Sequence, residues 1–255
     1  MALIHNILIR GLNSIYNQCL NLSSPQDISD FLTYCTCWSL TLRSHHRTEE
    51  SVYFPLLESM VRSENKGVAE KNHEEHERFL EGLGRFDEWI GEAQKGEREY
   101  DGGELRRLIE RFARELEEHL RSEVEVLLGL ERDEGVDWEV LGKTMARESK
   151  RVADRVGLSM FSNASFFCLI SLSVCFIMTL RNIWLNLTMI QAREVPFLIV
   201  NADVTYEGGI HGPRFPPFPW FVGQIFRWWY VPQLKGAWRF ASCDDYGMPK
   251  ELPFA

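Results

Sequence analysis

The chain has 255 residues, 45% of them hydrophobic and 25% charged, with a formal net charge of −9 at pH 7. This length allows one compact domain with an appended region. The whole of the acidic excess lies before residue 158, so that part lacks the clustered cations that phosphate binding needs, and nucleic acid is excluded as a partner.

Two helices are predicted in residues 2–20 and 27–56, because apolar residues recur there at steps of three and four. His5 lies on the apolar stripe of the first helix. His45 and Glu49 lie four positions apart on the stripe of the second. Charged or polar groups at such buried positions are costly unless they are paired, neutral or bound to a metal.

Two further helices are predicted in residues 68–90 and 105–127. The stripe of the first passes through His76, and the stripe of the second through His119 and Glu123, which repeat the spacing of four. Because two helices carry the same histidine–carboxylate pair on a buried face, one shared metal site is indicated.

The second helix has readable limits and one ambiguity. Ser24 followed by Pro25 is typical of an N-cap and first turn, and Pro55 predicts a kink near the far end. His46 and Glu50 repeat the four-residue spacing one position off the stripe, so a solvated or outer, ligand-orienting role is favoured for both.

Four short runs of sequence resemble the hemerythrin-like (HHE cation-binding) domain, in the order expected for that family. They are HNILIRGLN from residue 5, HHRTEESVYFP from residue 45, NHEEHERFLEGL from residue 72 and HLRSE from residue 119. The resemblance covers residues 1–130. It implies an all-α fold, an antiparallel four-helix bundle with a dinuclear non-haem iron site in its core.

The resemblance implies seven metal ligands, carried over residue by residue: His5, His45, Glu49, His73, His76, His119 and Glu123. The chain departs from the family at His73, which stands three positions before His76 rather than four. Either His73 or a water molecule therefore completes the site.

Two iron ions are the expected cofactor, although histidine and carboxylate also accept zinc or manganese. A centre rich in histidine favours binding or sensing of O2, another small diatomic ligand, or iron itself. The alternatives are a di-iron enzyme acting on peroxide, nitric oxide or a similar small oxidant, and an iron-storage protein or metal-free scaffold. Outside the ligand set no residue is nominated as catalytic.

Three regions follow the bundle. Residues 131–157 are expected to form an additional amphipathic helix capped by Asp137, and residues 158–190 an apolar insertion. Residues 191–255, rich in proline, glycine and aromatic residues, are expected to form an irregular cap against the bundle. An exposed aromatic surface is the alternative for this last region.

The apolar insertion is interpreted first as the translation of an unspliced intron. Two other interpretations stay open. Residues 158–180 carry no charge and are long enough to span a bilayer, so they are the one segment through which the chain could contact a membrane. A helix packed on the bundle is the other. Because the six cysteines form no Cys-x-x-Cys pair and no secretory signal is evident, a cytoplasmic protein with reduced thiols is expected.

Overall fold

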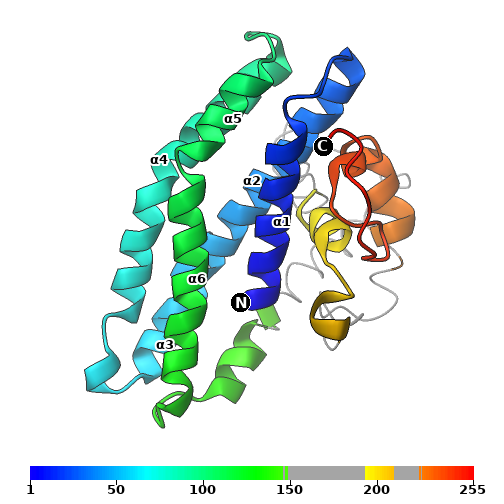
Figure 1. Cartoon of the computed structure of the whole chain (residues 1–255). Helices are drawn as coiled ribbons and strands as arrows, with labels where there is room; N and C mark the ends of the chain where they lie inside the picture. Colours follow the sequence, from blue (N-terminus) through cyan, green and yellow to red (C-terminus); the bar gives the residue numbers. More distant parts are fainter. Residues whose placement is uncertain (146, 149–192, 210–223, 225) are drawn as a thin grey trace, which may run out of the picture.

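The structure is a computed structural model that describes residues 1–145, 147–148, 193–209, 224 and 226–255. Within these residues the fold is all-α, as predicted, and its centre is a bundle of antiparallel helices (Figure 1). The main helices are α1 (Ala2–Gln18), α2 (Pro25–Thr48), α3 (Phe54–Met60), α4 (Val68–Lys95), α5 (Gly102–Glu110) and α6 (Ala113–Gly129).

Short 3₁₀ and π segments connect and extend these helices. They are η1 (Glu49–Tyr53), η2 (Ser63–Asn65), η3 (Leu130–Arg132), η4 (Tyr206–Gly209), η6 (Phe226–Tyr230), η7 (Val231–Leu234) and η8 (Ala237–Phe240). A further helix starts after Asp137, whose Oδ1 accepts the backbone N–H of Val140 at 2.9 Å, as expected for its cap. The part of this predicted helix beyond residue 148 lies outside the described residues.

Helix α2 begins where the sequence predicts and gives way to a π-helical turn before Pro55. Ser24 caps it by accepting the backbone N–H of Asp27 at 3.1 Å. At Glu49 the helix becomes the π-helical turn η1, which leads into α3 with Pro55 in its first turn. A π turn inside a longer helix is often found at functional sites.

The fourth predicted helix is interrupted, which the sequence did not indicate. Helices α5 and α6 are separated at Arg111 and Phe112, where Phe112 leaves the helical region (φ −126°, ψ −15°). At this break Phe112 packs closely against both α4 and α2. A Cβ on Gly82 would lie 2.6 Å from the Cβ of Phe112, and the Phe112 ring stacks on Trp38.

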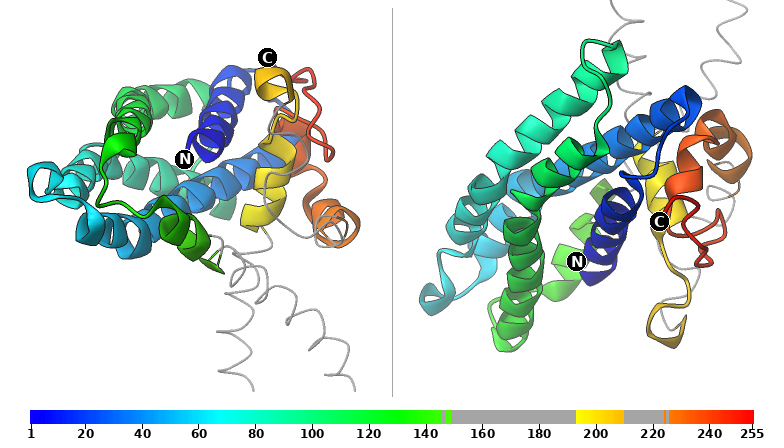
Figure 2. Two further views of the ribbon diagram at one scale, coloured as in Figure 1. Left: turned by 90° about the horizontal axis from the view of Figure 1, so that it is seen from below. Right: turned by 45° about the horizontal axis from the view of Figure 1, so that its top comes forward.

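The described C-terminal segments pack on α1 and α2 (Figure 2). Phe240 contacts Phe31 with ring centroids 5.1 Å apart, and the Tyr34 hydroxyl donates to Asn201 Oδ1 at 2.8 Å. Gln18 Nε2 donates to the carbonyl of Phe240 at 3.0 Å. This region also exposes large aromatic side chains, at Trp228, Trp229 and Tyr246.

The apolar insertion at 158–190 falls outside the described residues, so its three interpretations stay open. Among the residues that the structure does describe, no helix is both long and apolar enough to cross a membrane. The division of the chain into four regions stays a prediction.

Candidate metal centre

One group of potential metal ligands gathers between α2, α4 and α6. It consists of His46, Glu49, His76 and His119, all buried, with one potential ligand atom from each lying within 4.8 Å of the others. The ring centroids of His46 and His76 are 4.3 Å apart, and those of His76 and His119 are 4.5 Å apart. We call this group cluster 1.

A second group adjoins the first and adds α1 to the site. It consists of His5, His45, Glu49 and Glu123, and we call it cluster 2. His45 Nε2 lies 2.9 Å from Glu49 Oε1, and His5 Nε2 lies 3.0 Å from Glu123 Oε2. All four helical arms of the bundle therefore contribute to one buried centre.

The two carboxylates lie between the clusters. Glu49 belongs to both, since its Oε1 contacts His45 and its Oε2 lies 3.7 Å from His76 Nε2. Glu123 likewise lies between His5 and the Nε2 of His119, which is 4.0 Å away. This is the position that bridging carboxylates occupy in a dinuclear site.

Hydrogen bonds at the far side of three imidazole rings fix which nitrogen faces the centre. The Nδ1 atoms of His5, His76 and His119 contact, respectively, the carbonyl of Leu120 at 2.9 Å, Glu50 Oε1 at 2.8 Å and Glu75 Oε2 at 3.2 Å. When Nδ1 carries the donated proton, Nε2 presents its lone pair to the centre. Carboxylate or carbonyl partners of this kind are typical of histidines that bind metals.

The inward nitrogens are placed as metal ligands are. His76 Nε2 and His119 Nε2 are 3.1 Å apart, and His5 Nε2 and His45 Nε2 are 3.0 Å apart. Two nitrogens about 2.1 Å from one metal, at a right angle, would be about 3.0 Å apart. Lone pairs facing each other at this distance repel unless a proton or a cation lies between them. The residues present therefore fit a metal ion.

Burial and charge change the proton affinity of the centre. Burial alone would lower the pKa of His5, but the carboxylates of Glu123, 3.0 Å away, and Glu49, 4.0 Å away, outweigh burial and raise it to about 9. Burial and the nearby Glu49 carboxylate raise the pKa of Glu123. Without a metal, protons therefore supply part of the positive charge that cluster 2 needs.

In cluster 1, by contrast, two histidines favour the neutral form. Burial, followed by the charge of His45, keeps the pKa of His46 well below its usual value of 6.5. Burial and His76 lower the pKa of His119 to about 4. These imidazoles stay neutral at physiological pH, and neutral imidazole is the form that binds metals.

The structure brings six of the seven residues expected as ligands into the two clusters, and places the seventh elsewhere. The six are His5, His45, Glu49, His76, His119 and Glu123. The side chain of His73 is 61% exposed, and its Nδ1 contacts Glu50 Oε1 at 3.1 Å. His73 thus lies beside the centre on the solvent side.

The expectation for His46 needs correction, because this residue is buried and belongs to cluster 1. Neither of its ring nitrogens has a hydrogen-bond partner. A helix in a four-helix bundle faces two neighbours, so the adjacent residues His45 and His46 both point inward, toward different clusters. The spacing of four from His46 to Glu50 did not identify it, because Glu50 lies outside both clusters. Glu50 itself takes the expected outer role, as the partner of His76.

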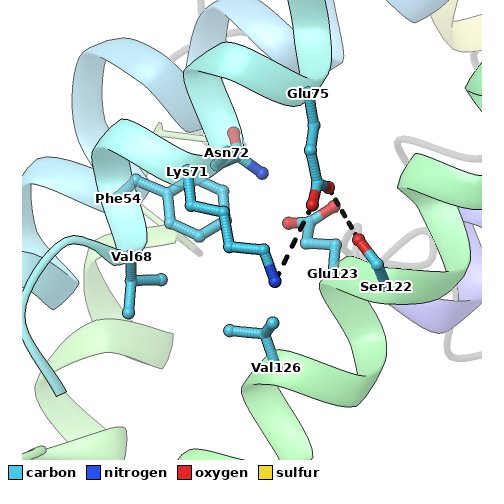
Figure 3. Close-up of a pocket in the computed structure, with 8 residues that line it drawn as sticks. All are labelled: Phe54, Val68, Lys71, Asn72, Glu75, Ser122, Glu123 and Val126. Carbon is cyan, nitrogen blue, oxygen red and sulfur yellow. Dashed lines mark hydrogen bonds and ion pairs between the residues drawn. The ribbon is translucent and has the colours of Figure 1, made fainter.

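A small cavity opens beside the centre, between α4 and α6 (Figure 3). Its lining consists of Phe54, Val68, Lys71, Asn72, Glu75, Ser122, Glu123 and Val126. The volume open to the centre of a water-sized molecule is about 10 Å³, which corresponds to roughly one such molecule. Glu123 of cluster 2 contributes to this lining, while both of its carboxylate oxygens are buried.

Comparison with known proteins agrees with this geometry. The family model of the hemerythrin HHE cation-binding domain matches residues 1–130. The dimeric xanthone biosynthesis cluster protein R11 of Cryptosporiopsis sp. (strain 8999) is 29% identical over 256 residues, which cover all of this chain and 81% of that protein. No solved structure matches the chain.

Proposed function

The chain belongs to the hemerythrin HHE cation-binding family, and from this premise we propose that it holds two non-haem iron ions and binds O2 or another small ligand at them. Its metal-binding character rests on the family and on the two buried clusters. The single observation that carries the proposal is the donor set, five imidazoles and two carboxylates with Glu49 shared by both clusters.

The proposed ligands divide between the two ions. His46, His76 and His119 would hold the first ion, and His5 and His45 the second, with Glu49 and Glu123 between them. When bound, iron supplies the open coordination positions and electrons that a small oxygen-derived ligand requires. Zinc or manganese would suit the same donors.

The two sides of the centre differ in their access to water. Phe79 packs against His46, His76 and His119 with ring centroids 5.1, 5.9 and 5.5 Å apart, and so keeps the cluster 1 side dry. The cavity opens on the side of Glu123 instead. Exclusion of water on one side favours retention of a bound small ligand over its release as a reduced product.

The similar protein from Cryptosporiopsis sp. is named as a dimeric xanthone biosynthesis cluster protein. A xanthone is far larger than the water-sized cavity beside the centre. We therefore propose a small ligand for this chain rather than an aromatic substrate.

Anaerobic loading with ferrous iron tests the proposal. We expect two iron ions per chain by elemental analysis, and an optical change on admission of O2 that reverses when O2 is removed. Binding of no iron, or of one ion only, would contradict the two-ion site.

A second candidate, a di-iron enzyme acting on peroxide, is favoured by the polar lining of the cavity. Sustained consumption of hydrogen peroxide by the iron-loaded chain, at many turnovers per centre and without a stable O2 adduct, would support it over O2 binding.

A further inference from the structure

Glu75, on α4, is a largely buried carboxylate that contacts a ligand histidine without belonging to either cluster. Its Oε2 atom lies 3.2 Å from Nδ1 of His119, and its side chain is 11% exposed. A carboxylate at this depth is costly unless it is paired. His119 is one of the groups that pair with it, on the side of the ring that faces away from the metal centre.

Two other side chains hold the carboxylate of Glu75 in place. Ser122, on α6, donates its hydroxyl proton to the same Oε2 atom at 2.6 Å (Figure 3). Lys71, one turn earlier on α4, places its Nζ atom 3.8 Å from Oε1. Because both oxygens have partners, the carboxylate is held facing His119. An acceptor fixed in this way also fixes the ring orientation and the tautomer of the histidine that donates to it.

The partners of the ligand histidines differ between the two clusters. In cluster 1, Nδ1 of His76 contacts the carboxylate of Glu50 at 2.8 Å, as Nδ1 of His119 contacts that of Glu75. In cluster 2, Nδ1 of His5 contacts a neutral group, a backbone carbonyl. A negatively charged acceptor makes an imidazole a stronger electron donor to its metal than a neutral acceptor does. An ion in cluster 1 would therefore receive more negative charge from its imidazoles.

We propose that Glu75 is a positioning residue that holds His119 for the ion in cluster 1, and that it makes this ion the more tightly bound and the more readily oxidised of the two. The added negative charge stabilises a ferric ion more than a ferrous one, because the ferric ion carries the larger charge. This role rests on the proposed function, since a positioning residue needs a bound ion to act on. The two ions should therefore differ in affinity and in reduction potential.

Glu75→Gln tests this role, because glutamine keeps the size of the side chain and an acceptor oxygen but removes the charge. Asp87→Asn is the matched control. Asp87 is also a carboxylate on α4 that accepts a serine hydroxyl from a neighbouring helix and pairs with a cation, here Ser39 and Arg43 of α2. Neither of these partners is a metal ligand, and Asp87 lies about 18 Å along the helix from Glu75. A general loss of helix packing would affect both variants.

Zinc, which is diamagnetic, gives two readouts. In competition with a chromophoric chelator, the wild-type chain should bind two zinc ions, and Glu75→Gln should weaken one of the two binding steps by about 10–100-fold. NMR of the imidazole signals of His119 and His5 during zinc addition assigns the weakened step, which should be that of cluster 1. In the loaded chain, Glu75→Gln should also shift the signal of the His119 Nδ1 proton upfield, because a neutral acceptor deshields this proton less than a carboxylate does.

The reduction potential is the third readout. In the iron-loaded chain, Glu75→Gln should reduce the preference of one ion for the ferric form by about tenfold, which raises its midpoint potential by about 59 mV. Potentiometric titration with dithionite, which supplies one electron to each ferric ion, measures this change. Asp87→Asn should leave the zinc affinities, the His119 signal and both potentials unchanged.

Metal binding by the wild-type chain separates failure of the proposed function from failure of the role of Glu75. If the wild-type chain binds no metal, the proposed function fails and this role fails with it. If it binds two ions and Glu75→Gln changes none of the three readouts, only the role of Glu75 is overturned. Equal changes in Asp87→Asn would overturn it too. Should Glu75→Gln fail to fold, Glu75→Asp withdraws the carboxylate from His119 by one methylene and should weaken the same zinc-binding step; an unchanged step would again overturn the role.

Discussion

Replacing His46 with leucine should change two properties of the protein in opposite directions. His46 is 5% exposed, lies in cluster 1 and has no hydrogen-bond partner for either ring nitrogen. A metal ligand whose nitrogens have no other partner destabilises the folded chain without metal and stabilises it when the metal is bound. A structural core histidine would instead stabilise the metal-free chain through hydrogen bonds of its own.

The size of both effects follows from this environment. Loss of an outer partner of a ligand weakens metal binding by about 10–100-fold. Loss of His46 as a direct ligand should weaken metal binding by at least about 100-fold, or roughly 3 kcal/mol of binding free energy. Each unpaired buried nitrogen costs about 1–3 kcal/mol, so His46→Leu should raise the free energy of unfolding of the metal-free chain by about 1–3 kcal/mol after some loss of packing.

Two measurements on the same variant test this prediction. Metal affinity is obtained by competition with a chromophoric chelator, and stability by urea unfolding in excess chelator. His73→Leu is the control, since the His73 side chain is 61% exposed and should change neither quantity much. A His46→Leu variant that is less stable without metal and binds metal normally would show that His46 is a core residue and that our assignment is wrong.

Three other substitutions have expected outcomes. Glu50→Gln weakens the partner that holds His76 Nδ1, so metal affinity should fall about 10–100-fold in a chelator competition at unchanged metal-free stability. Burial raises the pKa of Glu194 from 4.5 to about 7, so the folded chain keeps a proton there that the unfolded chain loses, and stability falls as the pH rises from 4.5 to 7. Glu194→Gln should remove that fall and raise the free energy of unfolding by about 2–3 kcal/mol at pH 8 but by little at pH 4.5. Urea unfolding at both pH values measures this difference, and an equal effect at both would refute the assignment. Gly11→Ala places a Cβ 2.6 Å from the ring of Phe197, and should reduce the unfolding free energy by about 1–3 kcal/mol; an unchanged urea midpoint would show that Phe197 moves aside freely.

Helical periodicity was enough to predict four helices and a metal site shared by their histidines, and the family resemblance implied the bundle. It works because a buried carboxylate such as Glu49 or Glu123 is too costly to occur on an apolar stripe without a partner. His46 was assigned to the wrong side because a single stripe is narrower than the face that a helix buries between two neighbours. The same rule predicts neither the change of winding at Glu49 nor the break at Phe112.

The C-terminal cap shows a different limit. Its aromatic residues predicted burial against the bundle, but not where, because Phe240 and Phe197 have no period that points to a partner. Their positions depend on gaps in the bundle surface, such as the one left by Gly11. Contacts of this kind come from the three-dimensional packing of two distant segments and leave no local sequence pattern.

The packing of the cap on α1 also has a consequence for the order of folding. The hydrogen bond from Gln18 to Phe240 joins residues separated by 222 positions, and Arg10 pairs with Asp203 across nearly as many. Contacts between such distant residues form late, because closing a long loop of chain is entropically costly. During synthesis, α1 is therefore made long before the C-terminal segments that pack on it. Since α1 carries His5, the final placement of this residue depends on a segment of chain that is synthesised much later.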